Sequence, residues 1–151
     1  MKSWVAAASA ALCTSLFAQA PPNTMQVVVT GGPHGGTYAP PGTETICMRV
    51  KGKQFSVGYR NMTAKDPNVL SEAGLEVQNP DDAGAKRGDV RIAFGDPDKS
   101  PTVYAINVPR DGPGTLTLTP GAKGADVAFQ GKTKDGIALR ITVRCLDIER
   151  L

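Results

Sequence analysis

Apolar and polar residues alternate along much of this chain, most regularly near its C-terminal end. In residues 136–145 one set of positions is apolar, and the positions between them are small, polar or charged. A period of two is typical of a β-strand with one face on a core and one face in water. We therefore expect a strand here that anchors a sheet, with the following apolar face: Ile137, Leu139, Ile141, Val143 and Cys145.

Shorter alternating segments recur along the rest of the chain, and most of the 17 glycines and 12 prolines fall between them. No stretch shows helical periodicity of useful length, although residues 68–73 leave room for one helical turn. Short strands at regular spacing with Gly/Pro/Asp turns are typical of an antiparallel β-sandwich. The sequence therefore predicts an all-β sandwich of eight or nine short strands without a substantial helix; a small β-barrel is the alternative. The other expected strands are residues 25–30, 43–50, 55–59, 75–77, 90–94, 103–108, 115–119 and 127–129.

The first twenty residues have the features of a secretory signal peptide. Lys2 gives a positive start, residues 5–12 form an apolar run, and Ala18-Gln19-Ala20 matches a small-x-small cleavage pattern. A membrane anchor is the alternative, but the run is shorter than the roughly 20 residues that a spanning helix needs. Because Pro21 would follow the cut, cleavage after Ala18 competes with cleavage after Ala20. We expect residues 1–20 to be removed and residues 21–151 to form a single domain in the periplasm or outside the cell.

Two cysteines remain after such a cleavage, Cys47 and Cys145. In an oxidising compartment a pair of this kind predicts one disulfide; two free buried thiols are the alternative. The strand pattern conflicts with this pairing, because Ile46, Met48 and Val50 form the apolar set around Cys47 and place it on the opposite face. A bulge near Cys47, or a strand that ends just before Cys145, would resolve the conflict.

Composition and charge exclude some classes of partner. The formal net charge is only +3, and the basic residues are scattered, which argues against nucleic acid as a ligand. Beyond the leader no apolar stretch is long enough to span a membrane. The sequence indicates no cofactor, and the expected partner is an unidentified protein or small-molecule ligand.

Catalytic chemistry has few candidates. The single histidine, His34, lies in the glycine-rich loop of residues 31–36. A Ser-His-Asp arrangement would have to combine it with a serine, yet Ser56, Ser71 and Ser100 all lack a nucleophile-elbow pattern. We expect His34 to be a solvent-exposed turn residue. A metal site built from several histidines is excluded, because the chain has one.

Aspartate pairs in loops offer a possible cation site. Asp96 and Asp98 could supply hard oxygen ligands to calcium, which takes six to eight oxygens. The alternative is turn chemistry, because aspartate side chains commonly accept hydrogen bonds from nearby backbone N–H groups. Methionines could form a soft copper site, but Met25 and Met48 are expected to fill the core.

The glycine-rich loop is also the expected ligand loop, with His34, Gly35 and Tyr38 as its binding residues. Tyr38 is the aromatic residue that the core needs least, and glycine lets backbone N–H groups approach a partner. The alternative is a loop that only closes one end of the sandwich. A pocket that gathers His34 with a carboxylate and a serine would favour an enzyme.

The segments Val29-Thr-Gly-Gly-Pro-His-Gly-Gly-Thr-Tyr38 and Gly131-Lys-Thr-Lys-Asp-Gly136, with the Val143-Arg-Cys145 ending, resemble a group of small exported bacterial proteins of unassigned function. The resemblance implies a β domain outside the cytoplasm and transfers no active residues. The functional hypothesis is an exported, non-enzymatic binding or structural module. The alternative is a small secreted enzyme or calcium-dependent protein that uses the loops around His34 and Asp96.

Overall fold

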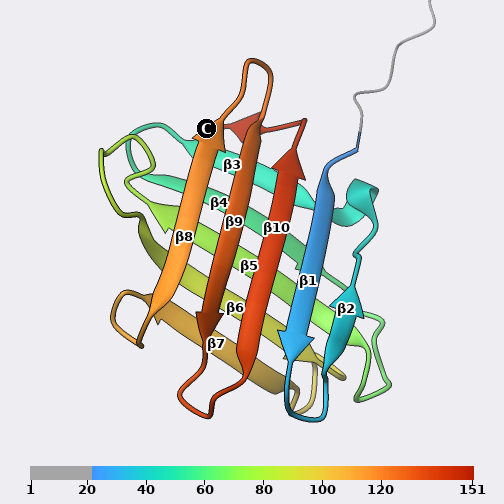
Figure 1. The fold of residues 1–151 in the computed structure, drawn as a ribbon. Coiled ribbons are helices and arrows are strands. Elements are labelled where there is room, and N and C mark those ends of the chain that lie inside the picture. The colour runs from blue at the N-terminus through green and yellow to red at the C-terminus, as the bar shows by residue number, and fades with distance from the viewer. Residues whose placement is uncertain (1–21) are drawn as a thin grey trace, which may run out of the picture.

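The structure is a computed structural model that describes residues 22–151; the expected signal peptide lies outside these residues. Two β-sheets pack face to face, and their strands cross at a clear angle (Figure 1). The first sheet has five antiparallel strands. In spatial order they are β2 (Gly36–Tyr38), β1 (Thr24–Thr30), β10 (Ala138–Cys145), β9 (Ala125–Lys132) and β8 (Gly114–Pro120).

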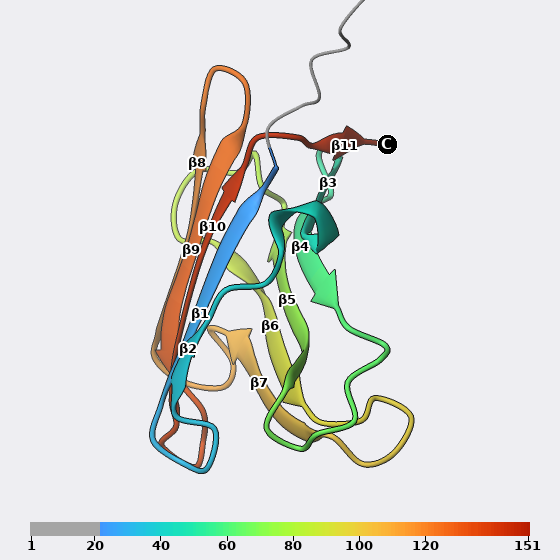
Figure 2. The ribbon, with the colours of Figure 1, turned by 90° about the vertical axis from the view of Figure 1, so that its right-hand side faces the viewer.

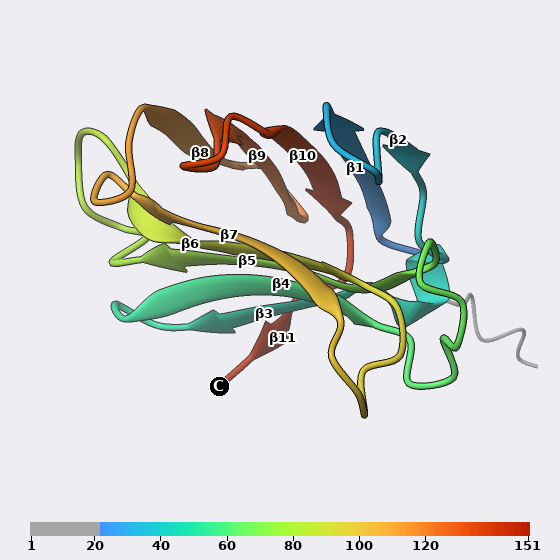
Figure 3. The same ribbon diagram turned by 90° about the horizontal axis from the view of Figure 1, so that it is seen from below.

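The second sheet has six strands. It forms the other layer, as the edge-on views of Figures 2 and 3 show. Adjacent strands in this sheet pair antiparallel, except that β11 pairs parallel to β3. In spatial order the strands are β11 (Glu149–Arg150), β3 (Ile46–Val50), β4 (Gln54–Arg60), β5 (Leu70–Gln78), β6 (Arg87–Phe94) and β7 (Thr102–Val108). The predicted sandwich is confirmed, and the sheets do not close into a barrel.

Residues 22–151 contain eleven strands rather than the expected eight or nine. β2 has three residues and β11 has two, which is too short for an alternating pattern to be visible. The helical turn considered at residues 68–73 is wrong, because β5 begins at Leu70. A register shift between Leu70 and Glu72 leaves Leu70 and Ser71 both buried, and this irregularity hides the alternation there. Residues 42–44, partly within an expected strand, form a short 3₁₀ turn, η1 (Gly42–Glu44).

β10 has the central place that its pattern predicts. It pairs with β9 along its whole length and with β1 from Ala138 to Arg144. Leu139, Ile141 and Val143 are buried, while Arg140 and Arg144 are exposed. The core between the sheets is completed by three fully buried phenylalanines: Phe55, Phe94 and Phe129.

Cys47 and Cys145 join the two sheets. Their sulfur atoms lie at disulfide-bonding distance, and their Cα atoms are 6.0 Å apart. The conflict between strand faces is resolved in neither of the expected ways. Cys47 faces the core, and the apolar neighbours Ile46 and Met48 face outward, with Ile46 52% exposed. The expectation that Met48 fills the core was therefore wrong.

Candidate functional site

His34 lies in the loop between β1 and β2, and the structure corrects the expectation that it is exposed. Only 6% of its surface is accessible. Its ring stacks on Phe94 of β6, with ring centroids 4.4 Å apart and planes 11° from parallel. The loop belongs to the five-stranded sheet and Phe94 to the six-stranded one, so His34 packs the two layers together at this end of the sandwich.

Both ring nitrogens of His34 have hydrogen-bond partners. Nε2 lies 3.1 Å from the carbonyl oxygen of Pro67, and Nδ1 lies 2.8 Å from the hydroxyl oxygen of Tyr104. A carbonyl oxygen can only accept, so Nε2 carries the hydrogen; in the neutral ring Nδ1 then accepts from the Tyr104 hydroxyl. Burial raises the pKa of Tyr104 above its ordinary value, with a smaller contribution from Tyr38, so this hydroxyl keeps its proton at neutral pH.

Tyr38 belongs to the same cluster and is not the free aromatic residue that the sequence indicated. Its ring meets Phe94 edge-on at a centroid distance of 4.9 Å, and its hydroxyl donates a 2.9 Å hydrogen bond to the His34 carbonyl. Gly35 is exposed beside them. The three residues expected to bind a ligand thus lie together, but the two aromatic rings hold the loop onto the core.

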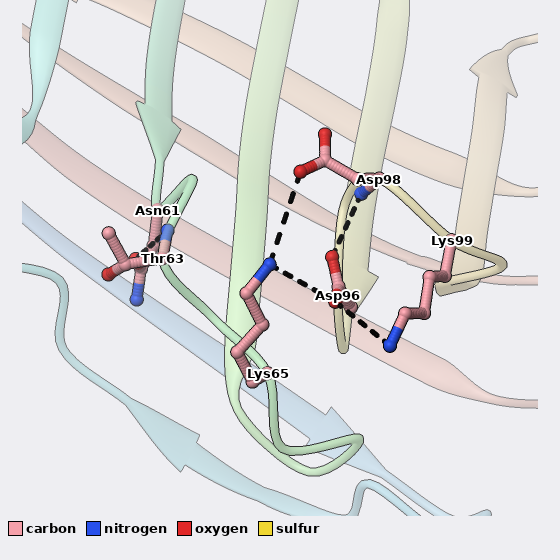
Figure 4. A network of polar contacts seen from close by, with 6 residues as sticks. All are labelled: Asn61, Thr63, Lys65, Asp96, Asp98 and Lys99. Atoms are coloured by element: carbon pink, nitrogen blue, oxygen red, sulfur yellow. Dashed lines mark hydrogen bonds and ion pairs between the residues drawn. The ribbon is translucent and has the colours of Figure 1, made fainter.

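Asp96 and Asp98 follow β6 in a turn at the same end of the molecule. The Asp98 backbone N–H donates to the Asp96 carboxylate at 3.1 Å, which is the turn chemistry considered as the alternative. Lys65 lies between the two carboxylates, 3.1 Å from Asp96 and 4.0 Å from Asp98, and Lys99 lies 3.6 Å from Asp96 (Figure 4). The negative charge of Asp96 is therefore balanced by lysines.

These contacts change the titration of Asp96. The backbone hydrogen bond from Asp98 is the main cause that holds the pKa of Asp96 below its ordinary 3.8. Burial opposes this shift, and the nearby Lys65 and Lys99 add to it. The carboxylate is therefore ionised at neutral pH and stabilised in that form by its neighbours. Calcium binding by Asp96 and Asp98 stays a prediction, and the ion would have to compete with Lys65 for the same oxygens.

The structure does not combine His34 with a carboxylate and a serine through hydrogen bonds. The loop of residues 61–69 supplies both Pro67, which contacts His34, and Lys65, which contacts Asp96. Among the serines, Ser71 is 1% exposed, and its hydroxyl has no hydrogen-bond partner within residues 22–151. Ser56 lies on the outer face of the same six-stranded sheet, where it lines a separate groove.

That groove is a feature that the sequence analysis missed. It has a volume of about 420 Å³ and lies on the outer face of the six-stranded sheet. Gly58 of β4 and Gly74 of β5 are cross-strand partners in its floor. Ile46 and Met48 of β3 lie along one side. A sequence signal existed at Gly58, which interrupts the expected strand of residues 55–59. Gly74 precedes the expected strand of residues 75–77, and only the register of the sheet brings the two glycines together.

No family model, curated protein or solved structure matches this chain. Within residues 22–151 there is also no helix with the length and apolar character that crossing a bilayer requires. Inferences about function therefore come from the geometry of the chain itself.

Proposed function

We propose that this chain is an exported, non-enzymatic binding or structural module that acts in the periplasm or outside the cell. One observation carries the proposal: the chemically reactive side chains that the sequence offered are engaged in holding the fold. His34 is stacked and hydrogen-bonded inside an aromatic cluster, Asp96 is paired with lysines, and the cysteines face each other across the core.

The cysteine pair supports export. Cys47 and Cys145 are 98 positions apart in sequence and lie at bonding distance between two sheets. Disulfides persist in oxidising compartments and are rare in the cytosol of mesophiles. A bridge that closes a long loop also stabilises a domain most on the chain-entropy model. The N-terminal pattern of Lys2, residues 5–12 and Ala18-Gln19-Ala20 supplies the export signal that this compartment requires.

The hydrogen bonds of His34 support a non-catalytic role. A general base needs a nitrogen free to accept a proton from substrate, within hydrogen-bond reach. In this structure Nε2 lies 3.1 Å from the Pro67 carbonyl oxygen and Nδ1 lies 2.8 Å from the Tyr104 hydroxyl, so both ring nitrogens are engaged within the fold. The neighbours of His34 are therefore those of a core residue, which favours the module over the small secreted enzyme.

The test is intact-mass analysis of the full-length chain expressed in a bacterial host, after separation of cytoplasm and periplasm. We expect a periplasmic or secreted protein that begins at Pro21 or at Gln19 and carries no adduct. Its mass should rise by two hydrogens on reduction, because one disulfide opens. A cytoplasmic full-length chain would contradict export, and a retained metal or redox cofactor would contradict the non-enzymatic module.

A further inference from the structure

Gly58 and Gly74 lie at the centre of the outer face of the six-stranded sheet, and neither the backbone conformation nor the available space requires glycine there. Neither has a positive φ. A Cβ at Gly58 would meet nothing within 4 Å, and at Gly74 only backbone oxygens at 3.9 Å. Glycine inside a strand weakens it, so its presence often marks a site where a ligand or another chain approaches closely.

The cross-strand register makes these glycines the floor of a groove. The row runs from Ile46 through Gly58 and Gly74 to Arg91. Two adjacent residues without side chains leave a flat backbone surface on which a ring can lie. The volume of about 420 Å³ is at the small end of the range of ligand pockets and suits one side chain.

The walls of the groove carry groups that attract aromatic rings. Met48 places a thioether along one side, and sulfur–aromatic contacts are favourable. Arg60 lies at the rim, and its side chain is 65% exposed. Its distance to Glu72 is 3.9 Å, which is long for an ion pair. Glu72 is closer to Arg91, at 3.2 Å, which leaves the Arg60 guanidinium free to stack on a ring.

The groove is open to solvent along the sheet, so it cannot enclose a small ligand on most sides as ligand pockets do. It can receive a side chain that projects from a larger body. We propose that this groove, lined by Gly58, Gly74, Ile46, Met48 and Arg60, binds an exposed aromatic side chain of a partner polypeptide. This inference rests on the proposed function as a binding module and names its partner surface.

The test uses the isotope-labelled domain and two probe peptides, acetyl-Gly-Ser-Trp-Ser-Gly-amide and the same peptide with leucine in place of tryptophan. An aromatic ring over the floor shifts the Gly58 and Gly74 Hα signals upfield. We expect a saturable shift at these two glycines with the tryptophan peptide. The leucine peptide should produce little or none.

Two groove variants and one control locate the binding. The double variant Gly58→Val/Gly74→Val fills open space, so it should fold and lose binding of the tryptophan peptide. Arg60→Gln should weaken the binding while leaving the floor intact, and it gives a second reading if the valine variant does not fold. Thr117→Val, on the outer face of the five-stranded sheet, should bind as the parent protein does.

Several results would overturn the proposal. They are the absence of a shift at both glycines with the tryptophan peptide, an equal response to the leucine peptide, and unchanged binding in both groove variants. Equal binding of free indole would assign the groove to a small molecule. Glycine shifts that depend on protein concentration without peptide would assign it to a second copy of the chain. Export and intact mass are measured independently, so failure here leaves the proposed function standing.

Discussion

Asn23 connects three parts of the chain at one corner of the sandwich. It is 6% exposed and lies just before β1. Its Nδ2 donates to the Thr45 carbonyl at 2.8 Å, and its Oδ1 accepts from the backbone N–H groups of Leu146 and Asp147 at 2.8 and 3.0 Å. The same corner holds Cys47 and Cys145, so Asn23 supports the chain segments next to the cysteine pair.

Asn23→Ala removes all three hydrogen bonds at once. A hydrogen bond contributes about 0.5–1.5 kcal/mol net, and a buried group left without a partner costs about 1–3 kcal/mol. Thr45 is buried, so its carbonyl stays unsatisfied, whereas Leu146 and Asp147 are accessible enough for water to replace part of the loss. We expect the free energy of unfolding to fall by about 2–4 kcal/mol.

The assay is urea unfolding of the oxidised protein, compared with Thr24→Ala as a control at the exposed neighbouring position. With an m-value of about 2 kcal/mol/M, the unfolding midpoint of Asn23→Ala should drop by about 1–2 M. Hydrogen exchange should also show lost protection at the Leu146 and Asp147 amides. If the free energies of unfolding of Asn23→Ala and Thr24→Ala lie within about 0.5 kcal/mol of each other, the Asn23 side chain does not stabilise this corner.

Three further predictions follow from other contacts. Cys47→Ala/Cys145→Ala should lower the free energy of unfolding by about 4–5 kcal/mol, because the bridge closes a long loop; an oxidised parent protein no more stable in urea than this variant would refute it. Asp96→Asn should destabilise at neutral pH. The loss of stability should shrink as pH falls through the lowered pKa of Asp96, because the parent carboxyl group then becomes neutral, as the asparagine already is. A difference in melting temperature between the parent and Asp96→Asn that stays constant as pH falls would contradict this. Gly88→Ala should destabilise by about 1–3 kcal/mol, because its Cβ would overlap the Glu76 carbonyl oxygen. Gly58→Ala should be neutral or stabilising by comparison, and equal calorimetric melting temperatures for the two variants would count against the close approach at Gly88.

The sequence predicted the sandwich because alternation and turn residues are local signals. The apolar face of β10 is buried as its pattern indicated. The same signal failed at β3, where Ile46 and Met48 are apolar yet face outward while Cys47 faces the core. Alternation defines two faces of a strand, but the packing of the other sheet decides which face is buried. At β3 the residue that decides is Cys47, through its contact with Cys145.

The environment of His34 could not be predicted from its loop. A histidine among glycines usually lies in solvent, and its burial here depends on Phe94 and Tyr104, which are distant in sequence. The tertiary contacts therefore override the local expectation. The groove was hidden for a similar reason, since Gly58 and Gly74 become neighbours only through the register of β4 and β5.

The two ends of the sandwich are closed by different sets of contacts, and the outer faces of the sheets take no part in either set. At one end the cysteine pair and Asn23 tie the start of β1 to the end of β10; at the other, His34 packs the first loop onto the opposite sheet. The outer faces of the sheets are not used in this way, and they differ from each other. Ile46 and Val103, both more than a third exposed, lie on the outer face of the six-stranded sheet. The outer face of β8 presents Thr115, Thr117 and Thr119. The glycine floor beside Ile46 distinguishes the outer face of the six-stranded sheet, and it is the surface that we propose for a partner.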